Sequence, residues 1–557
     1  MVLSRRSVLR TLGTGLATAS VSSLGWTGSA RASDLALSDR IDLLYSNQFN
    51  FNARGEPQIT VGLMTGQRKI ELSAPDGFDI LPSGDGGTRI RAGKRLTVQL
   101  GKSAPAKQTY TLVLEELVGK HALRPDATME RWKKKGFTPS DEEIGTVFGV
   151  EGRVLDNRRM LVTSGRFTSE RVALEHAFQA KKEHGAVGKL HPRVHNRAEG
   201  RMVARDLEHD VDVTAEGVLW FTPRGGGAIT VHDVLSGTTM GTGTRSDRKY
   251  LGSMYVAIDA SGKLSVVNLV SESDLLAGLV PAEIFASAPM EALKAQAVAA
   301  RGQLVTKVGT RHLADPFLVC SEQHCQVYKG RGHEHPRTTK AVKQTVGLVA
   351  MRPSETQLVD TVYSANSGGH TEHNDVVWPG AADAQLRGRP DPKLGKSFRE
   401  GIDEANIAAF LRKPPSSFSQ PPPGTAQTPY RWTETIDPSA VAGNTGVPKD
   451  VGIIKAMRVS DRGRSGRATT LELEGSKRSI TIRGELRIRR ALGGLKSSMF
   501  IIGETRDKFG RFVLEGGGHG HGVGLCQHGA MGMARAGKTV EEILAHYYTG
   551  CHVVKLW

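Results

Sequence analysis

The sequence lacks the features of several common protein classes. After the amino-terminal segment 1–32, no stretch is apolar and long enough to span a bilayer, so we expect no transmembrane segment in the mature chain. The formal net charge is +17, yet no zinc-finger spacing and no alternation of aromatic with basic residues occurs. Nucleic acid is therefore not an expected partner. No internal repeat is present, which excludes a repeat architecture.

Cysteine is also scarce, with four residues in 557. In an exported chain four cysteines ordinarily indicate two disulfides. The positions argue against that arrangement, because Cys320 and Cys325 lie close together around His324, whereas Cys526 and Cys551 stand near the carboxyl end.

The amino-terminal segment 1–32 has the order of an export signal. Paired arginines at Arg5 and Arg6 precede a mildly apolar stretch, residues 11–26, and Ala30-Arg31-Ala32 offers small residues for cleavage. This pattern is typical of the twin-arginine route, which exports folded proteins. We expect residues 1–32 to be the signal and the mature protein to reach the periplasm or the cell surface. A disordered basic terminus is the alternative.

Length and pattern predict an α+β fold of about three domains. Residues 33–150 read as a β-rich amino-terminal module, with β-branched runs such as 58–64. Residues 151–214 form a small α/β module around a predicted helix from Ser169 to His184. Residues 215–557 read as a mixed strand and helix domain with a proline-rich insertion near 413–428.

Helix signals are strongest in this last domain. Pro289 and Glu291 are favourable start signals for a helix whose apolar residues include Leu293, Ala297 and Leu304. A further helix is expected around 481–492, and a last one from Thr539, where Glu542 completes a capping box.

Two thiols and two imidazoles lie in one short segment of the sequence, and this set of ligand types suits tetrahedral zinc. Its members are His312, Cys320, His324 and Cys325. With four protein ligands the metal would be structural and would activate no water. A strained disulfide and a pair of packed cysteines are the alternatives.

Two glutamates are candidates for acid catalysis. Cleavage of a glycosidic bond needs a carboxyl group that protonates the leaving oxygen. Glu291 has a structural explanation, since an acid in a first helical turn opposes the helix dipole. Glu283 has a weaker one, as a cap after Pro281.

A glycine-rich segment, residues 516–530, contains three histidines. No Lys-Ser/Thr pair follows it, so it is not a phosphate loop. His519, His521 and His528 fit a second metal site, a sugar-binding surface, or simply a tight turn from strand to helix.

Five motifs, in order, resemble the SpoIID/LytB family, which includes amidase enhancers and stage II sporulation protein D-like proteins. They are EALKAQAVAAR at 291–301, VCSEQHCQVYKG at 319–330, YSANSGGHTEHNDVVW at 363–378, RRALGGLKSSMF at 489–500 and GHGHGVGLCQHGA at 518–530. The resemblance spans about 215–557. The segment 151–214 is weakly similar to wall-binding SPOR modules, an ordinary α+β unit being the other interpretation.

This resemblance implies a peptidoglycan lyase, a lytic transglycosylase acting on denuded glycan strands. The family's catalytic glutamate falls on Glu283, with Glu291 as second choice; Ile284 replaces the usual methionine after it. The family's zinc ligands fall on the four residues named above. Residues implied to line the glycan groove are Tyr363, Ser367, His370, Trp378, His521 and Gln527.

Two other functions stay open at this point. A non-enzymatic wall-binding protein that stimulates an N-acetylmuramoyl-L-alanine amidase is the first, with the amidase as its partner. A zinc hydrolase is the second, and it would need a water-bearing metal site at the three histidines of the glycine-rich segment.

Overall fold

The computed structural model describes most of the chain from residue 44 onward. The described residues are 44–45, 48, 50–82, 89–118, 124–236, 243–378, 380–395, 398–422 and 429–557. The predicted export signal lies outside them, as do residues 423–428 of the predicted proline-rich insertion. Within these ranges, no helix has the length and apolar character needed to cross a membrane.

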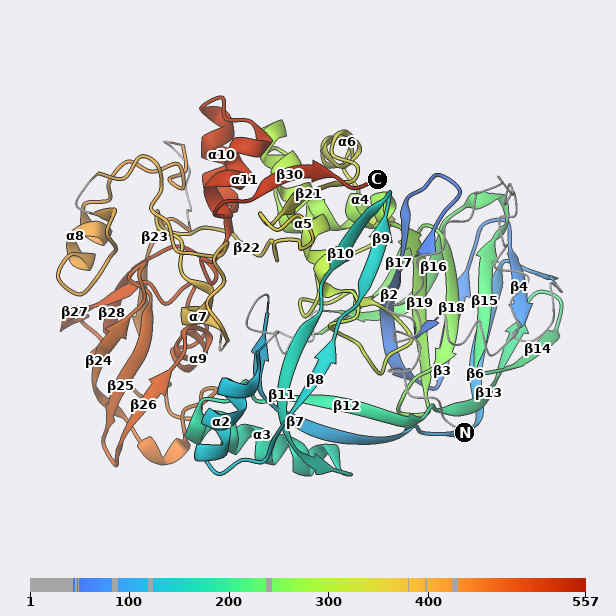
Figure 1. Ribbon diagram of the computed structural model, residues 1–557, viewed down its shortest axis with the longest axis horizontal. Helices are drawn as coiled ribbons and strands as arrows, with labels where there is room; N and C mark the ends of the chain where they lie inside the picture. Colours follow the sequence, from blue (N-terminus) through green and yellow to red (C-terminus); the bar gives the residue numbers. More distant parts are fainter. Residues whose placement is uncertain are drawn as a thin grey trace, which may run out of the picture.

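Strands dominate the amino-terminal half, at the right of Figure 1. The eight described strands of the largest sheet have the order β1-β2-β19-β18-β15-β4-β5, with β20 parallel to β2. They are β1 (Asn50–Phe51), β2 (Pro57–Gln67), β4 (Phe78–Pro82), β5 (Ile90–Ala92), β15 (Val218–Pro223), β18 (Ser253–Ile258), β19 (Leu264–Ser271) and β20 (Val319–Cys320).

Two further sheets complete this half, with α2 and α3 beside the smaller one (Figure 1). Six described strands have the order β14-β13-β6-β3-β16-β17. They are β3 (Lys69–Ser73), β6 (Arg95–Ala104), β13 (Glu199–Asp206), β14 (Val211–Glu216), β16 (Ile229–Ser236) and β17 (Thr244–Tyr250). Four described strands have the order β12-β7-β11-β8, and β9 and β10 form a hairpin. Their bounds, with those of the helices, are β7 (Lys107–Leu117), β8 (Pro139–Ile144), β9 (Val147–Val150), β10 (Arg153–Asp156), β11 (Arg159–Phe167), β12 (Lys189–Asn196), α2 (Asp126–Lys134) and α3 (Glu170–His184).

Sheet pairing joins segments that are far apart in sequence. Strand β6 pairs with β13, β7 pairs with β11 and β12, and β2 pairs with β19. Strands on either side of residues 150 and 214 therefore share sheets. The division of the chain into separate modules at these two positions stays a prediction.

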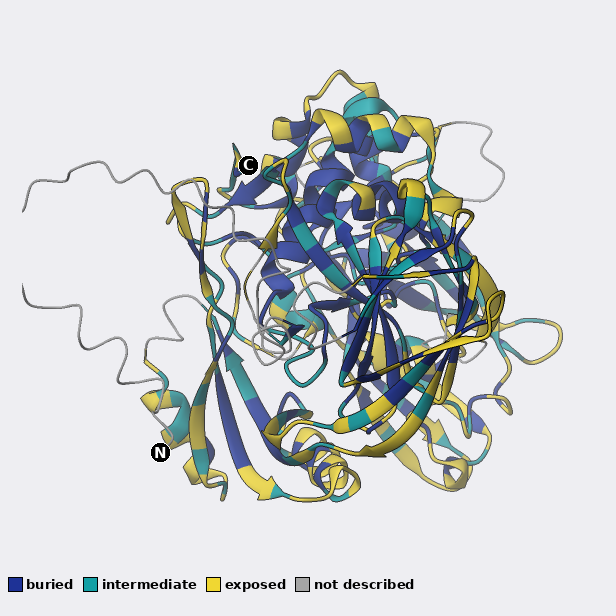
Figure 2. Ribbon diagram, turned by 90° about the vertical axis from the view of Figure 1, so that its right-hand side faces the viewer, coloured by how far each residue is buried: buried dark blue, intermediate teal, exposed yellow. Residues whose placement is uncertain are grey.

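Five helices pack together around α5, at the top centre of Figure 1. They are α4 (Glu272–Glu283), α5 (Met290–Lys307), α6 (Pro336–Gln344), α10 (Gln527–Arg535) and α11 (Val540–Tyr547). Helix α5 starts where Pro289 predicts, but it is buried on all sides and not only on the predicted apolar face (Figure 2). Its many alanines explain the difference, because small side chains let neighbouring helices approach from several directions.

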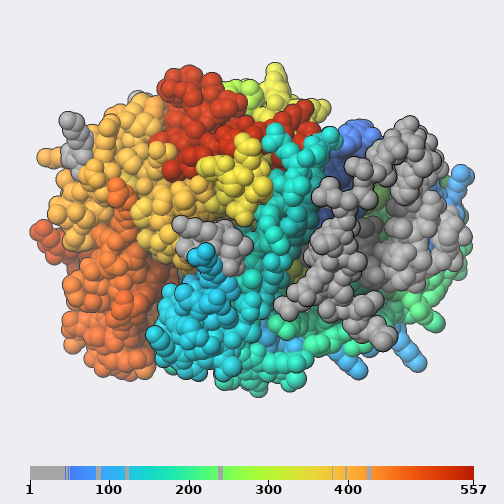
Figure 3. Space-filling model, viewed as in Figure 1, coloured from blue at the N-terminus to red at the C-terminus, as the bar shows by residue number. Residues whose placement is uncertain are grey.

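A second lobe, residues 407–517, occupies the left of Figure 1 and has its own apolar core. The space-filling view shows it in contact with the red carboxyl-terminal segment on one face (Figure 3). Its elements are α8 (Ile407–Arg412), β23 (Arg431–Ile436), β24 (Ile454–Arg462), β25 (Ala468–Gly475), β26 (Ser479–Arg483), α9 (Glu485–Ala491), β27 (Phe500–Arg506) and β28 (Phe512–Gly517). The helix expected at 481–492 begins later, because residues 481–483 pair with β25.

Short strands return the chain from this lobe to the helical core. Strand β22 (Tyr363–Ser364) pairs in parallel with β29 (Leu525–Cys526), and β21 (Leu348–Met351) pairs with β30 (His552–Lys555). A short helix, α7 (Asn374–Val377), precedes the second lobe. Residues before and after the lobe therefore meet in one site.

The predicted α+β class with a β-rich amino-terminal half is confirmed. The helix expected from Ser169 is α3, and the Ser169 hydroxyl accepts a hydrogen bond from the backbone N–H of Val172. The predicted capping box of α11 is present between Thr539 and Glu542.

The motif 291–301 ends in Arg301, which is fully buried and pairs with the buried Glu272 of α4 at 2.7 Å. Removal of one partner leaves an uncompensated charge in the core. We therefore expect Arg301→Ala to lower the free energy of unfolding by about 3–5 kcal/mol, measured by urea denaturation. The double variant Glu272→Gln/Arg301→Met should lose less than Arg301→Ala alone. An equal or larger loss would show that packing, and not the unpaired charge, causes the effect.

Candidate active site and metal centre

Glu283 is the last residue of α4, and the chain leaves the helix directly after it. Ile284 adopts an extended conformation and its side chain is buried, which anchors the end of the helix. Burial raises the pKa of the Glu283 carboxyl above its usual range, although the Val327 N–H and the Tyr363 hydroxyl oppose this by hydrogen bonding to it. The carboxyl is thus held in a setting that favours its protonated form.

Two further side chains surround this carboxyl. The Tyr363 hydroxyl lies beside Glu283 and the side chain of Gln296, and its pKa is raised well above the usual value by burial and by the Glu283 charge. The Gln527 amide donates to the backbone carbonyl of Glu283 at 2.8 Å and to Gln296 Oε1 at 3.1 Å. Residues from α4, α5, β22 and α10 therefore meet at one point.

The parallel pairing of β22 with β29 positions Tyr363 and Gln527. Tyr363 pairs with Leu525, two residues before Gln527, which begins α10. The preceding chain passes very close to its neighbours: a Cβ on Gly524 would lie 2.2 Å from the Val362 carbonyl oxygen, and one on Gly522 would lie 2.3 Å from the Arg467 guanidinium carbon. Both glycines have positive φ, at 69° and 78°. The glycine-rich segment is required for this approach.

His521 and Trp378 extend the site from Tyr363. The two rings stack with centroids 4.8 Å apart, and the His521 side chain also hydrogen-bonds the Tyr363 backbone. Burial and the nearby Arg467 lower the pKa of His521 to about 3, so its ring is neutral at physiological pH. Trp378 is 39% exposed and can offer a face to a ligand.

Ser367 and His370, by contrast, lie in the protein interior. The Ser367 hydroxyl is 3.1 Å from that of Ser419, a buried residue of the segment predicted as a proline-rich insertion. His370 Nδ1 is 2.7 Å from the Thr371 carbonyl oxygen, and burial lowers the pKa of its ring to about 4. The structure does not bring these two side chains to the surface beside Glu283.

Glu291 has the structural surroundings that its sequence position indicates. Its carboxylate accepts from the Lys294 ammonium at 2.7 Å and from the Val540 N–H at 3.0 Å, at the start of α11. It therefore ties α5 to α11 at the amino-terminal ends of both helices.

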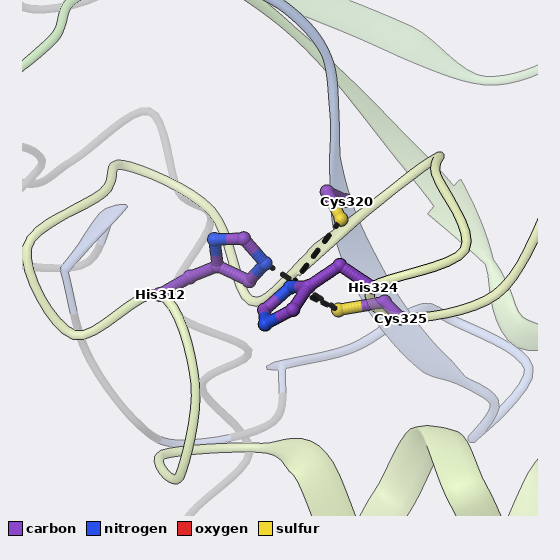
Figure 4. Close-up of side chains that lie close together, drawn as sticks. All are labelled: His312, Cys320, His324 and Cys325. Carbon is purple, nitrogen blue, oxygen red and sulfur yellow. Dashed lines mark hydrogen bonds between the residues drawn. The ribbon is translucent and has the colours of Figure 1, made fainter. Parts of the chain in front are cut away.

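The four predicted zinc ligands come together in the loop after α5, and their side chains point toward one another (Figure 4). All four donor atoms lie within 4.8 Å of one another. Cys325 Sγ is 3.4 Å from His312 Nε2, and both Sγ atoms are 3.8 Å from His324 Nδ1. A tetrahedron with zinc–ligand bonds of about 2.0–2.3 Å has edges of about 3.4–3.8 Å. These distances fit zinc.

Neighbouring groups support this cluster. His312 Nδ1 is 2.8 Å from the Asp315 carboxylate, the arrangement that orients metal-binding imidazoles through their second nitrogen. Hydrogen bonding with Cys320 and with both imidazoles lowers the pKa of Cys325, whereas the same contact with Cys325 raises that of Cys320. A second thiolate therefore needs a cation beside it.

Among the described residues, this is the single group of three or more His, Cys, Asp or Glu side chains able to hold a metal. His519, His521 and His528 do not form a second one. His519 is exposed and pairs through its backbone with Asn366, and His528 Nδ1 lies 2.8 Å from the Ala365 carbonyl oxygen. The tight-turn interpretation of the segment is the one that its geometry supports.

Sequence reasoning missed two residues of these sites. Gln296 stands among alanines on a helix that is buried all round, and a lone polar side chain in such a setting needs a specific partner. Asp315 follows His312 by three residues, a spacing that lets a carboxylate reach the imidazole. Both positions carry signals that were readable in advance.

Comparison with known proteins supports the resemblance seen in the motifs. Residues 260–351 match the model of the stage II sporulation protein family, and residues 372–524 match a domain of unknown function (DUF8618). The amidase enhancer of Bacillus subtilis is 28% identical over 299 residues, covering 49% of this chain and 39% of that protein. Stage II sporulation protein D of the same organism is 27% identical over 303 residues, or 52% and 76% of the two chains. An uncharacterized protein of Brachyspira hyodysenteriae is 29% identical over 307 residues, or 55% and 72%.

Fold and site together define an α+β protein with a buried glutamate beside a clustered Cys₂His₂ loop. The chain belongs to the SpoIID/LytB family.

Proposed function

We propose that this protein is an exported lytic transglycosylase that cleaves denuded peptidoglycan strands between N-acetylmuramic acid and N-acetylglucosamine. The relatives named as a sporulation protein and an amidase enhancer indicate a role at the cell wall. The observation that carries the proposal is Glu283: a carboxyl with a raised pKa, bordered by Tyr363 and Gln527, at the centre of the family's motifs.

In this mechanism Glu283 acts twice. As an acid it gives its proton to the oxygen that links the two sugars, and the C1–O bond of the muramic residue breaks. The resulting carboxylate then takes the proton of the muramic C6 hydroxyl while that oxygen bonds to C1. A 1,6-anhydro ring forms, no water is consumed, and Glu283 regains its proton.

The neighbouring side chains position the acid and the strand. Tyr363 and the Val327 N–H hydrogen-bond the carboxyl and orient it after its proton has left. Trp378 offers an exposed ring for a sugar, backed by His521. Gln527 holds the end of α4 through the backbone of Glu283.

Zinc, bound by His312, Cys320, His324 and Cys325, would be structural in this scheme. Val327 follows the last ligand by two residues, so the metal loop carries one of the donors to Glu283. The ion supplies rigidity to that loop and takes part in no bond change.

The proposed acid role predicts a pH dependence. Because Glu283 must enter the reaction protonated, kcat/KM should fall as the pH rises through its raised pKa. The expected profile has a descending limb above the range of an ordinary glutamate, measured by anhydromuramyl product formation from pH 4 to about pH 9. A rate that rises through this range would contradict a general acid.

A non-enzymatic role as a peptidoglycan-binding modulator of an N-acetylmuramoyl-L-alanine amidase is the second candidate. The similarity to an amidase enhancer and the departure from the family pattern at Ile284 favour it. Incubation with intact sacculi and a purified amidase separates the two: anhydro ends made by the protein alone indicate a lyase, and peptide release that only accelerates with amidase indicates a modulator.

Transport by the twin-arginine route and residence in the periplasm or at the cell surface are part of the proposal. They rest on the sequence of residues 1–32 and on a basic chain that suits an anionic wall.

A further inference from the structure

Phe285 is 70% exposed, the highest value among the exposed large apolar side chains of the described residues. It stands two residues after Glu283. A single exposed apolar side chain requires no explanation by itself. Its position beside the candidate acid and the way its backbone is held give it one.

The backbone directs this ring away from the core. Ile284 is extended, with φ −133° and ψ 145°, and its side chain is 4% exposed. Successive side chains of an extended chain point to opposite sides, so burial of Ile284 sends Phe285 outward. Two Cα steps span at most about 7 Å, which keeps the ring and the carboxyl within reach of one glycan strand.

The turn that carries Phe285 is clamped. The Ala288 N–H donates to the Phe285 carbonyl at 2.9 Å, and Ala288 itself is buried. The guanidinium of Arg337, on α6, donates to the carbonyls of Ala286 and Ala288 at 2.9 and 2.8 Å. A ring displayed on a rigid turn loses little conformational freedom when a ligand packs on it.

We propose that Phe285 is an aromatic platform for a pyranose ring, forming a sugar subsite beside Glu283 that is separate from Trp378. This inference rests on the proposed function, in which the ligand is a glycan strand. The CH face of a pyranose and its N-acetyl methyl group are apolar surfaces that pack on an aromatic ring. Trp378 reaches Glu283 through His521 and Tyr363, whereas Phe285 follows it directly in the chain.

The subsite is tested by calorimetric titration of denuded glycan oligosaccharides into the full-length mature protein. All variants carry Glu283→Gln, so that the strand is not consumed. Phe285→Ala should weaken binding about tenfold, the size of one aromatic packing contact, and Phe285→Trp should restore it. The matched control is Phe509→Ala: Phe509 is 68% exposed, on the distant β27–β28 turn, and its loss should leave the affinity unchanged.

In the active protein, the platform should act on KM more than on kcat. Phe285→Ala is expected to raise KM about tenfold with little change in kcat, whereas a merely structural role would lower kcat and stability together. Near-UV circular dichroism and thermal melting establish that the variant is folded.

The outcomes separate this inference from the proposed function. Affinity that is unchanged in Phe285→Ala, or equally weakened in Phe509→Ala, overturns the platform alone. Binding that depends on Phe285, without anhydro products from the wild type, overturns the lyase and supports the platform. Absence of any glycan binding by the Glu283→Gln protein overturns both.

Discussion

Replacement of Glu283 by glutamine should abolish the formation of anhydromuramyl products from denuded glycan strands. Glutamine keeps the size of the side chain but has no proton to give to the glycosidic oxygen. General acid catalysis contributes about 10²–10⁴-fold to rates, so the remaining activity should fall by at least about a hundredfold. Mass spectrometry of the products of purified wild type and variant measures this loss.

The fold of this variant should survive. The pKa of the Glu283 carboxyl is raised by burial, so a neutral amide replaces a group whose neutral form the site already favours. We expect the free energy of unfolding to change by less than about 1 kcal/mol. A lost reaction in a folded protein then reports on chemistry.

Glu291→Gln is the matched comparison, because this glutamate lies in the same motif region but pairs with Lys294 and the Val540 N–H. It should retain product formation and lose about 1 kcal/mol of stability or less, as expected for a partly exposed pair. Wild-type rates in Glu283→Gln, together with inactivity in a folded Glu291→Gln, would transfer the acid role to Glu291. Products from neither the wild type nor the variants would favour the amidase modulator.

Removal of zinc should cause the largest loss of stability. An ion present at a thousand times its Kd contributes about 4 kcal/mol to the free energy of unfolding. We therefore expect one zinc per chain by plasma mass spectrometry. Treatment with a strong chelator should lower Tm by at least about 5 °C, with recovery on addition of zinc.

Cysteine variants distinguish a metal site from packed thiols. Cys325→Ser should lose the metal and reproduce the lower Tm of the chelated protein, since Cys325 Sγ contacts both imidazoles. Cys551→Ser is the control: Cys551 lies outside the cluster, 3.7 Å from the Leu544 carbonyl oxygen, and its loss should leave zinc content unchanged. Metal-free wild type, or a Tm that the chelator does not alter, contradicts a structural zinc.

Local signals in the chain predict local features well. The N-cap at Ser169, the start of α5 at Pro289 and the capping box of Thr539 with Glu542 are all found where sequence places them. Each depends on interactions between residues that are close neighbours in the chain, so neighbouring residues are sufficient to specify it. The ligand types of the metal loop belong to the same category, because His312 to Cys325 span a single short segment.

Exposure was harder to predict than position. Ser367 and His370 lie in the same motif as Tyr363, yet packing against Ser419 and the surrounding chain buries them. Phe285 stands beside an acid in a region of mostly buried residues, yet it is largely exposed. A side chain's direction depends on which partners cover it, and those partners come from segments that are distant in sequence.

The sequence by itself therefore determined the α+β class, the helix boundaries that caps define, the ligand set of the metal loop and the family to which the chain belongs. The tertiary structure alone decided that Glu283 meets Tyr363, Gln296 and Gln527, each from a different element. It also decided that Glu291 binds a helix terminus and that the second lobe lies between the two strands that build the site. The reason is physical: hydrogen-bond caps act within one turn of chain, whereas burial and the pKa shifts that follow from it arise from the packing of segments that are distant in sequence.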